Sequence, residues 1–231
     1  MTSPAARSTW VIIPAFNEAR SVAAVVEALK GEGYHLVIVD DGSTDETAQI
    51  AAGLGVNVCR HRVNLGQGAA IQTGIEWALG RGASYFVTFD ADGQHAAADI
   101  PKLVAPLMKG RADVALGSRF VSSGRAEGIP AGRRVVLWLA VRFTRLSTGL
   151  AVTDTHNGIR ALNTSAARSI QITQNGMAHA GQILRQVKSQ GLRWVEVPVA
   201  ITYTPYSLAK GQRLWNIVAI IRESIMGIFR T

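Results

Sequence analysis

Residues 9–46 read TWVIIPAFNEARSVAAVVEALKGEGYHLVIVDDGSTDE, and this stretch decides the fold class. Residues 9–14 are a short apolar, β-branched run, which predicts a buried strand. Residues 21–29 repeat apolar side chains at helical spacing, and residues 36–39 predict a second buried strand. A strand, a helix and another strand in this order predict a parallel unit with a right-handed crossover.

The same alternation continues through the first hundred residues. Residues 43–46 supply capping side chains for a helix that runs through residue 52, and residues 56–60 predict a third strand. A helix at residues 67–79 and a fourth strand at residues 84–89 follow. The sequence therefore predicts an α/β fold with a mostly parallel, doubly wound sheet, in which ligands bind beyond the carboxyl ends of the strands.

After residue 102 the alternation weakens. We expect a strand at 113–117, a mobile loop at 122–132, a basic amphipathic helix at 133–146, a helix at 177–190 and a strand at 194–201. The chain has 231 residues, of which 48% are hydrophobic, and it shows no internal repeat. We therefore expect one catalytic domain that spans residues 1–231.

The compartment and the membrane relation are constrained by a few features. Cys59 is the single cysteine, so no intrachain disulfide can form and a reducing compartment, the cytoplasm, is expected. Residues 1–8 do not read as a secretory signal. Residues 135–152 and 214–229 are apolar but are interrupted by charges, so both fall short of the roughly 20 residues that a span needs. The second segment either lies in a membrane interface, as a peripheral contact, or packs on the core.

Charge is distributed unevenly along the chain. The formal net charge is +8, but residues 1–100 hold 6 Lys and Arg against 11 Asp and Glu, whereas residues 101–231 hold 18 against 5. The second part is therefore suited to anions such as phosphates or anionic lipids. No nucleic-acid partner is expected, because no zinc-ligand spacing, aromatic RNA-binding strand or basic heptad helix is present.

Polar side chains gather where the predicted strands end. Asp90 and Asp92 follow the fourth strand and, two residues apart, project together from an extended chain. Two carboxylates at this spacing suit Mg²⁺ or Mn²⁺, with Gln94 as a third oxygen and open positions left for a diphosphate. The alternative is an ordinary acidic turn. Of Asp40 and Asp41, after the second strand, we expect one to bind a base or ribose and the other to be structural.

Several motifs together identify a family. They are Pro14-Ala15-Phe16-Asn17-Glu18, Val39-Asp40-Asp41-Gly42-Ser43-Thr44-Asp45, Asn64-Leu65-Gly66-Gln67-Gly68-Ala69, Asp90-Ala91-Asp92-Gly93-Gln94-His95, Gly117-Ser118-Arg119, Asp154-Thr155-His156-Asn157-Gly158-Ile159-Arg160 and Glu196-Val197-Pro198. Their order is that of family 2 glycosyltransferases. The chain most resembles the dolichyl- or polyprenyl-phosphate mannose and glucose synthase branch, and the resemblance covers nearly the whole chain.

This resemblance implies a GT-A fold, a GDP- or UDP-linked sugar donor and an inverting transfer of a hexose to a polyprenyl phosphate. Residues 1–100 would form the nucleotide-sugar-binding half, and residues 101–231 the basic acceptor side. It implies donor binding by Pro14, Ala15, Asn17, Glu18, Asp40, Asp41, Asp45 and the turn Gly66, Gln67, Gly68. It also implies metal and diphosphate binding by Asp90, Asp92 and Gln94, and contact with the acceptor phosphate by Arg119 with Arg133 or Arg134.

Two positions depart from the family pattern. Many members carry Lys where this chain has Gln67, so a charge contact with the donor is missing. Near the C terminus, Lys210 stands in a different pattern from the usual one, and it is the candidate for a further diphosphate contact.

Alternatives remain open at this point. A pyrophosphorylase or a dinucleotide-dependent oxidoreductase should show a glycine-rich loop after the first strand, and residues 14–17 do not provide one. A non-catalytic sugar-nucleotide-binding protein stays open, as does transfer to a saccharide hydroxyl in cell-surface polysaccharide synthesis. A hydroxyl acceptor needs a general base, for which Asp154 is the candidate; otherwise Asp154 ties down its loop. The sugar, the base and the oligomeric state stay undetermined.

Overall fold

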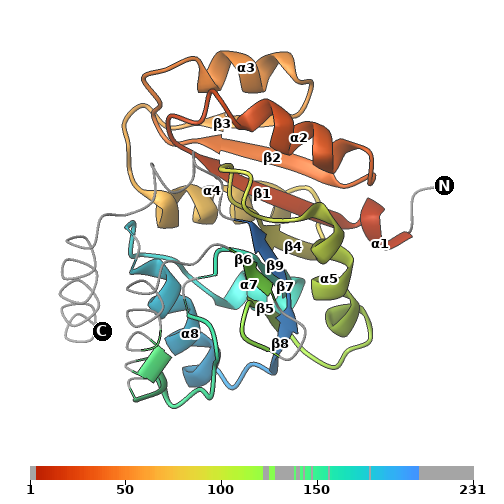
Figure 1. The fold of residues 1–231 in the computed structure, drawn as a ribbon, viewed down its shortest axis with the longest axis vertical. Coiled ribbons are helices and arrows are strands. Elements are labelled where there is room, and N and C mark those ends of the chain that lie inside the picture. The colour runs from red at the N-terminus through yellow and green to blue at the C-terminus, as the bar shows by residue number, and fades with distance from the viewer. Residues whose placement is uncertain are drawn as a thin grey trace.

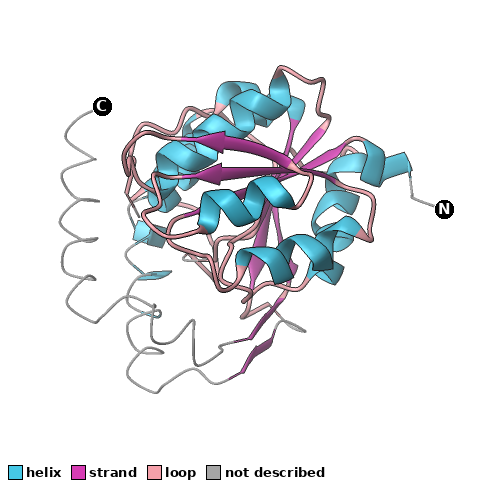
Figure 2. Ribbon diagram, turned by 90° about the horizontal axis from the view of Figure 1, so that it is seen from above, coloured by secondary structure: helices cyan, strands magenta, loops and turns pink. Residues whose placement is uncertain are grey.

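The fold is described from a computed structural model, which places residues 4–121, 125–127, 138, 141–142, 144–146, 148–155, 157–176 and 178–202. Within these residues the centre is a seven-stranded sheet with helices on both faces (Figures 1 and 2). The strand order is β3-β2-β1-β4-β7-β5-β8; β7 runs antiparallel to both of its neighbours, and all other neighbouring strands in this sheet are parallel. The expected mostly parallel α/β sheet is confirmed.

The strands of this sheet are short and largely buried. They are β1 (Thr9–Ala15), β2 (His35–Asp40), β3 (Asn57–Arg60), β4 (Tyr85–Thr88), β5 (Val114–Ser118), β7 (Arg160–Asn163) and β8 (Trp194–Pro198). A second small sheet pairs β6 (Arg125–Glu127) with β9 (Ala200–Thr202). Because β7 is antiparallel, its first residue lies at the edge where its neighbours β4 and β5 end.

Helices cover the two faces of the sheet in separate groups. The helices are α1 (Pro4–Arg7), α2 (Val22–Lys30), α3 (Thr47–Gly53), α4 (Gln67–Leu79), the 3-10 turn η1 (Ala97–Asp99), α5 (Ile100–Met108), α7 (Thr164–Ser169) and α8 (His179–Ser189). Apolar side chains of α2, α3 and α5 pack with one face of the sheet. Those of α4, α7 and α8 pack with the other face. The result is a three-layer sandwich (Figure 2).

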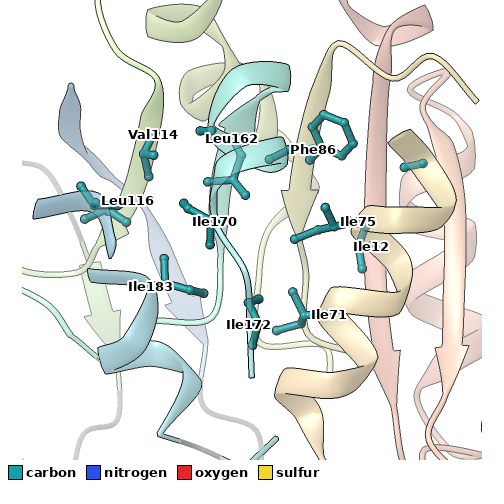
Figure 3. Close-up of a cluster of buried hydrophobic side chains, with 14 of the residues drawn as sticks. Ile12, Ile71, Ile75, Phe86, Val114, Leu116, Leu162, Ile170, Ile172 and Ile183 are labelled. Atoms are coloured by element: carbon teal, nitrogen blue, oxygen red, sulfur yellow. The ribbon is translucent and has the colours of Figure 1, made fainter. Parts of the chain in front are cut away.

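The core beneath α4 shows how tightly these layers meet. Figure 3 shows Ile71 and Ile75 of α4 beside Ile12 of β1 and Phe86 of β4, and all four are buried. A side chain on Gly74 would place its Cβ 2.3 Å from Ile12 Cγ2, so the helix can lie this close to β1 only with glycine there. Each large aliphatic side chain buried in this way contributes about 1.5–3 kcal/mol to stability.

Several expected elements differ in their extent. The helix expected after the capping residues 43–46 begins at Thr47 and ends at Gly53, one residue beyond its expected end. Residues 43–45 form hydrogen bonds with the loop after β1. The strand expected at 194–201 is two strands in different sheets, separated at Val199, whose N–H donates to Ser118. The short elements α5, β6, β7 and α7 had no counterpart in the sequence prediction. Most of the expected loop at 122–132 and helix at 133–146, and all of residues 214–229, lie outside the described residues.

Candidate active site

The candidate site lies along one edge of the large sheet. The carboxyl ends of β1, β2 and β4 meet there, as the pairing of Ala15 with Asp40 and of Ile12 with Thr88 requires. The amino end of β7 reaches the same edge through Arg160, which lies between Thr88 of β4 and Leu116 of β5. Segments that are far apart in the sequence therefore contribute side chains to one surface, as expected for this kind of sheet.

The loop after β1 is bound to the loop after β2. Asn17 has a φ of 54°, and its N–H donates to Ser43 Oγ (2.9 Å) while its Oδ1 accepts from the Thr44 N–H (2.9 Å). The Glu18 N–H donates to Thr47 Oγ1 at 2.8 Å, and the buried Glu18 carboxylate accepts from Ser21 Oγ at 2.7 Å.

Asp45 also links the loop after β1 to the loop after β2. Its Oδ1 accepts from the Thr47 N–H at the start of α3 (3.0 Å), and its Oδ2 accepts from the Ala19 N–H (3.2 Å). These contacts give Asn17, Glu18 and Asp45 supporting roles in the loops. Contacts between them and a donor stay predictions.

Asp40 and Asp41 have contrasting surroundings. Asp41 is fully engaged: its Oδ1 contacts His61 Nδ1 (2.7 Å) and accepts from the Leu65 N–H (2.9 Å), and its Oδ2 accepts from the Gly66 N–H (2.7 Å). Asp40 is buried, with Oδ1 near the Ser43 N–H and Oδ2 3.1 Å from Arg60 Nε. Within the described residues, Asp40 Oδ2 accepts no hydrogen bond.

His61 extends this network to α4. Its Nε2 lies 3.0 Å from Thr73 Oγ1, so the ring bridges Asp41 and the helix that follows the glycine turn. Sequence reasoning did not single out His61, because its role depends on contacts with residues at distances of 12 and 20 along the chain.

The glycines of the turn before α4 are required by a neighbouring backbone. A Cβ on Gly66, where φ is 104°, would lie 2.3 Å from the Asn175 carbonyl oxygen, and one on Gly68 would lie 2.1 Å from that of Gln174. The Gly68 N–H donates to the Asn175 oxygen at 2.7 Å. Close packing thus accounts for both glycines, whatever the turn binds, and their predicted contact with a nucleoside is untested. Gln67 instead reaches the acidic motif, where its Nε2 donates to Asp90 Oδ1 at 2.9 Å.

Asp90 and Asp92 differ although one residue separates them. Asp90, 28% exposed, contacts Gln67 through Oδ1 and His95 Nε2 through Oδ2 (3.0 Å). Gly158 leaves room for it, because a Cβ there would lie 2.2 Å from Asp90 Oδ2. Asp92 Oδ1 accepts from the Gln94 N–H at 3.0 Å, whereas no described residue donates to its Oδ2.

The charge state of the two acids follows from these contacts. Burial alone would raise the pKa of Asp90, but the hydrogen bond and charge of His95, with His179 and Arg160, hold it below its ordinary value. Burial and the neighbouring charge of Asp90 raise the pKa of Asp92 to about 6, although the Gln94 N–H opposes this. Asp92 is therefore a largely buried carboxyl group beside a second, ionised carboxylate.

These residues fit a hard divalent cation that is shared with a ligand. Among the described residues, no group of three or more His, Cys, Asp or Glu side chains could hold a metal alone. Asp92 nevertheless offers a carboxylate oxygen without a donor, beside a second carboxylate. Mg²⁺ commonly takes only one or two carboxylates and completes its coordination with phosphates and water. Ligation by Asp90 and by Gln94 remains a prediction, because Asp90 already accepts bonds at both oxygens.

On the other side of β7, Arg119 and Asp154 form a closed pair. Arg119 Nε and Nη2 donate to Asp154 at 2.6 and 2.7 Å, and the two side chains are 5% and 0% exposed. Glu196 Oε1 accepts from Thr153 N–H (2.7 Å) and Asp154 N–H (3.2 Å), which holds this loop on β8. The geometry is consistent with Asp154 as a loop anchor, and direct contact of Arg119 with an acceptor stays a prediction. Arg133, Arg134 and Lys210 lie outside the described residues.

Pro14 and Ala15 contribute backbone rather than side-chain groups. They pair with Val39 and Asp40 of β2, and the Ala15 carbonyl accepts from the Asp41 N–H at 2.8 Å.

The side chain of His95 is almost completely buried, and its ring packs against that of Phe89. Its Nδ1 has no partner among the described residues. Cys59 packs against the core, and burial raises the pKa of its thiol.

Comparison with known proteins identifies the family. The model of Glycosyl transferase family 2 matches residues 10–170, which contain all the site residues described so far except Glu196 and those of the 174–179 segment. The chain belongs to glycosyl transferase family 2. In this family 2 chain the match begins in β1 and includes β7.

Two of the relatives of this family 2 chain show which activities occur among similar proteins. It is 34% identical to the UDP-N-acetylglucosamine–dolichyl-phosphate N-acetylglucosaminyltransferase of Methanococcus voltae, with 87% of this chain and 88% of the relative covered. It is 31% identical to the polyprenol monophosphomannose synthase of Mycolicibacterium smegmatis, with 87% and 80% covered.

A solved structure has the same fold. Glucosyl-3-phosphoglycerate synthase from Mycobacterium tuberculosis, in complex with Mn²⁺ and UDP-glucose, superposes with a TM-score of 0.72 at 21% identity. The superposition covers 96% of this chain and 77% of the other. The sheet is therefore that of a GT-A glycosyltransferase. In the described part of the chain, no helix has the length and apolar character needed to cross a bilayer.

Proposed function

We propose that this family 2 glycosyltransferase transfers a hexose from a nucleotide-diphosphate donor to a polyprenyl phosphate, with inversion. The phosphate oxygen of the acceptor attacks the anomeric carbon, the bond from that carbon to the diphosphate breaks, and the nucleoside diphosphate leaves. The two relatives described above are named for transfer to dolichyl phosphate and for polyprenol monophosphomannose synthesis, which supports this acceptor class. The sugar and the base remain open between GDP- and UDP-linked donors.

The observation that carries this proposal is the closed pair of Arg119 and Asp154. A saccharide hydroxyl must lose a proton to a general base during attack, and Asp154 was the candidate for that base. Its carboxylate is fully buried and both oxygens accept from Arg119, so it is not directed at an acceptor. A phosphate monoester has a second pKa of about 6 and is already an anion at neutral pH, so it needs no base.

Donor binding is supported by the unmatched groups along the edge of the sheet. Asp40 Oδ2 is buried and lies 3.1 Å from Arg60 Nε, but it accepts no hydrogen bond from the described residues, so a nucleoside N–H or ribose hydroxyl would supply one. Asp92, with Asp90 and Gln94 as further candidates, would hold Mg²⁺ or Mn²⁺ beside the diphosphate. That cation would offset the negative charge that develops on the leaving group.

The test is a transfer assay with a panel of donors and two classes of acceptor. GDP-mannose, UDP-glucose and UDP-N-acetylglucosamine are each supplied with Mn²⁺ or Mg²⁺, and a polyprenyl phosphate and free saccharides are offered side by side. We expect transfer to the lipid phosphate. Transfer only to the saccharide would favour the hydroxyl-acceptor alternative, and binding without transfer or hydrolysis would favour a non-catalytic sugar-nucleotide-binding protein.

Peripheral membrane contact is part of this proposal, because a polyprenyl phosphate is presented by a bilayer. The excess of 18 Lys and Arg over 5 Asp and Glu in residues 101–231 supports attraction to anionic lipid headgroups. The chain should sediment with vesicles that contain anionic lipid, and less so as salt is raised. Equal sedimentation with neutral vesicles would contradict an electrostatic contact.

A further inference from the structure

Arg160 lies at the seam between the two parts of the candidate site. It begins β7, the antiparallel strand that separates β4 from β5, and it pairs with Thr88 on one side and Leu116 on the other. Asp90 follows β4 by two residues, and Asp154 is bound to Arg119 after β5. Arg160 is therefore a cation placed between the expected donor side and the expected acceptor side.

The guanidinium of Arg160 is buried but poorly bonded. The residue is 6% exposed, and the hydrogen bond from its Nη2 to the Thr155 carbonyl is long, at 3.5 Å. No described residue accepts a hydrogen bond from its Nε or Nη1. An arginine offers five N–H donors in a planar fork. The Nε and Nη1 atoms of Arg160 are not among the fully buried side-chain atoms that lack a partner, so they keep contact with solvent and are open to a ligand.

The two nearest carboxylates do not satisfy these donors. Asp90 and Asp154 both influence Arg160 electrostatically, but neither forms an ion pair with it. The oxygens of Asp90 contact Gln67 and His95, and those of Asp154 accept from Arg119. The acids thus balance the charge of Arg160 at a distance and leave its hydrogen-bonding fork for another group.

Two helix N-termini meet on the same face of the sheet. Arg160 and Leu162 point to one face of β7, and Leu162 packs with the core beneath α4 and α8. The second residue of α4, Gly68, lies against His179 at the start of α8, because a Cβ on Gly68 would come within 2.9 Å of His179 Cβ. Helix N-termini attract anions, which adds to the attraction of the arginine.

We propose that Arg160 binds a phosphoryl oxygen of the substrate at this seam, through the Nε and Nη1 side of its guanidinium. The planar fork matches a phosphate oxyanion, which an ammonium group does not replace. The inference rests on the proposed function, because the phosphoryl group belongs either to the donor diphosphate or to the acceptor phosphate. Arg160 then joins the two halves of the site by contact with the reacting groups.

The test uses Arg160→Lys, which keeps a cation between Asp90 and Asp154 but removes the fork. Calorimetry with Mn²⁺ compares UDP with UMP, and GDP with GMP. If Arg160 contacts the donor diphosphate, affinity for the diphosphate falls by about tenfold or more, while affinity for the monophosphate stays within about twofold. If it contacts the acceptor, nucleotide affinities stay unchanged and KM for polyprenyl phosphate rises by about tenfold.

Unchanged nucleotide affinities together with an unchanged KM would overturn the inference and leave Arg160 as a buried counter-charge. Arg81→Lys is the matched control, because Arg81 stacks on Trp77 beyond the far end of α4 and should change neither quantity. Arg160→Gln is a second variant, for which the same losses are expected.

A measurement on the wild type covers the case in which neither variant folds. In excess chelator, sodium pyrophosphate should raise the melting temperature above that in sodium chloride of equal ionic strength, because the arginine attracts it without metal. No difference between the two salts would contradict the inference. The proposed function fails separately, if the wild type binds neither UDP nor GDP in the presence of Mn²⁺.

Discussion

At the scale of single residues, the two carboxylates of the acidic motif, Asp90 and Asp92, differ in their hydrogen-bond partners. Asp90 accepts bonds from Gln67 and His95 at its two oxygens, whereas Asp92 keeps an oxygen to which no described residue donates. Burial and the neighbouring charge of Asp90 raise the pKa of Asp92 to about 6, so a cation beside both carboxylates would favour the charged form of Asp92. Asp92 is therefore the residue on which a divalent cation should depend most.

Asp92→Asn should leave the fold intact and remove metal-dependent transfer. The amide is a weaker ligand than the carboxylate, so we expect kcat/KM to fall by at least about a hundredfold, which corresponds to about 3 kcal/mol. Activity is measured over a Mn²⁺ titration, with circular dichroism and the melting temperature as checks on folding. Glu27→Gln alters an exposed acid that pairs with Lys30 on α2, so its metal dependence should match the wild type. Full turnover of the Asp92 variant, or of the wild type in excess chelator, would contradict the prediction.

Asp40 should affect donor binding more than the chemical step. Its Oδ2 is buried and accepts no bond from the described residues, so a nucleoside donor group would gain a partner there. Asp40→Ala is expected to weaken nucleotide binding by about tenfold, or about 1.4 kcal/mol, with a smaller change in kcat. Calorimetry with UDP and GDP measures the affinity. If neither titration changes, Asp40 has a structural role, as the neighbouring Asp41 does through its bonds to Leu65 and Gly66.

At the scale of elements, the turn before α4 is positioned by packing. Asp41 accepts hydrogen bonds from the Leu65 and Gly66 N–H groups. The Asn175 carbonyl packs against Gly66, and the Gln174 carbonyl packs against Gly68. This arrangement directs Gln67 at Asp90. The turn therefore contacts the loop at 174–176 on one side and, through Gln67, the acidic motif on the other.

Gly68→Ala should destabilise the protein and lower activity together. The new Cβ would lie 2.1 Å from a backbone oxygen, so the turn or the loop must move, at a cost of about 1–3 kcal/mol. Gly53→Ala in α3 is the control, since its Cβ would meet nothing within 4 Å. That variant should gain about 0.4–1 kcal/mol. Urea unfolding of both variants decides the matter, and equal midpoints would show that the turn yields without strain.

The elements that could be predicted were those in which apolar residues recur with a clear helical or strand periodicity over several residues. The helix expected at residues 67–79 is α4 with the same bounds, because its apolar spacing and the glycine turn before it agree. The four-residue strand β7 was missed, since Arg160 and Asn163 interrupt too short a run for periodicity to be visible. The candidate site follows the same rule: residues within motifs could be singled out from the sequence, whereas His61 and the proposed role of Arg160 depend on contacts between segments that are distant in the chain.

At the scale of the whole molecule, the carboxyl ends and the amino ends of the parallel strands differ in how completely their polar side chains are bonded. The edge at the carboxyl ends of the parallel strands carries polar groups with few partners: Asp40 Oδ2, which faces Arg60, Asp92 Oδ2, and the guanidinium of Arg160. At the beginning of β5, by contrast, Asp113 is fully matched. It accepts from Asn163 Nδ2 (2.9 Å) and from Arg193 Nε (3.0 Å) and Nη2 (2.8 Å), which joins β5 to β7 and β8. This cluster is built for stability rather than for binding.

The Asp113 cluster gives a prediction for the acid stability of the whole protein. The side-chain hydrogen bonds of Arg193 lower the pKa of Asp113 to about 2, against burial, which would raise it. A carboxyl whose folded pKa is depressed contributes stability above its unfolded pKa of about 3.9, and this stability is lost as the pH falls toward 2. Because Arg193 is 60% exposed and screened by solvent, we expect only about 1 kcal/mol.

Asp113→Asn should therefore lower the free energy of unfolding by about 1 kcal/mol at pH 6, and the deficit should shrink between pH 4 and pH 2. Urea unfolding at several pH values gives the difference between wild type and variant, which removes the contribution of the other acids. Glu27→Gln, which loses an exposed pair with Lys30 on α2, is the control, and its difference from the wild type should stay small. A deficit of Asp113→Asn that is constant from pH 6 to pH 2 would show that the hydrogen-bonding geometry, and not the charge of Asp113, joins these three strands.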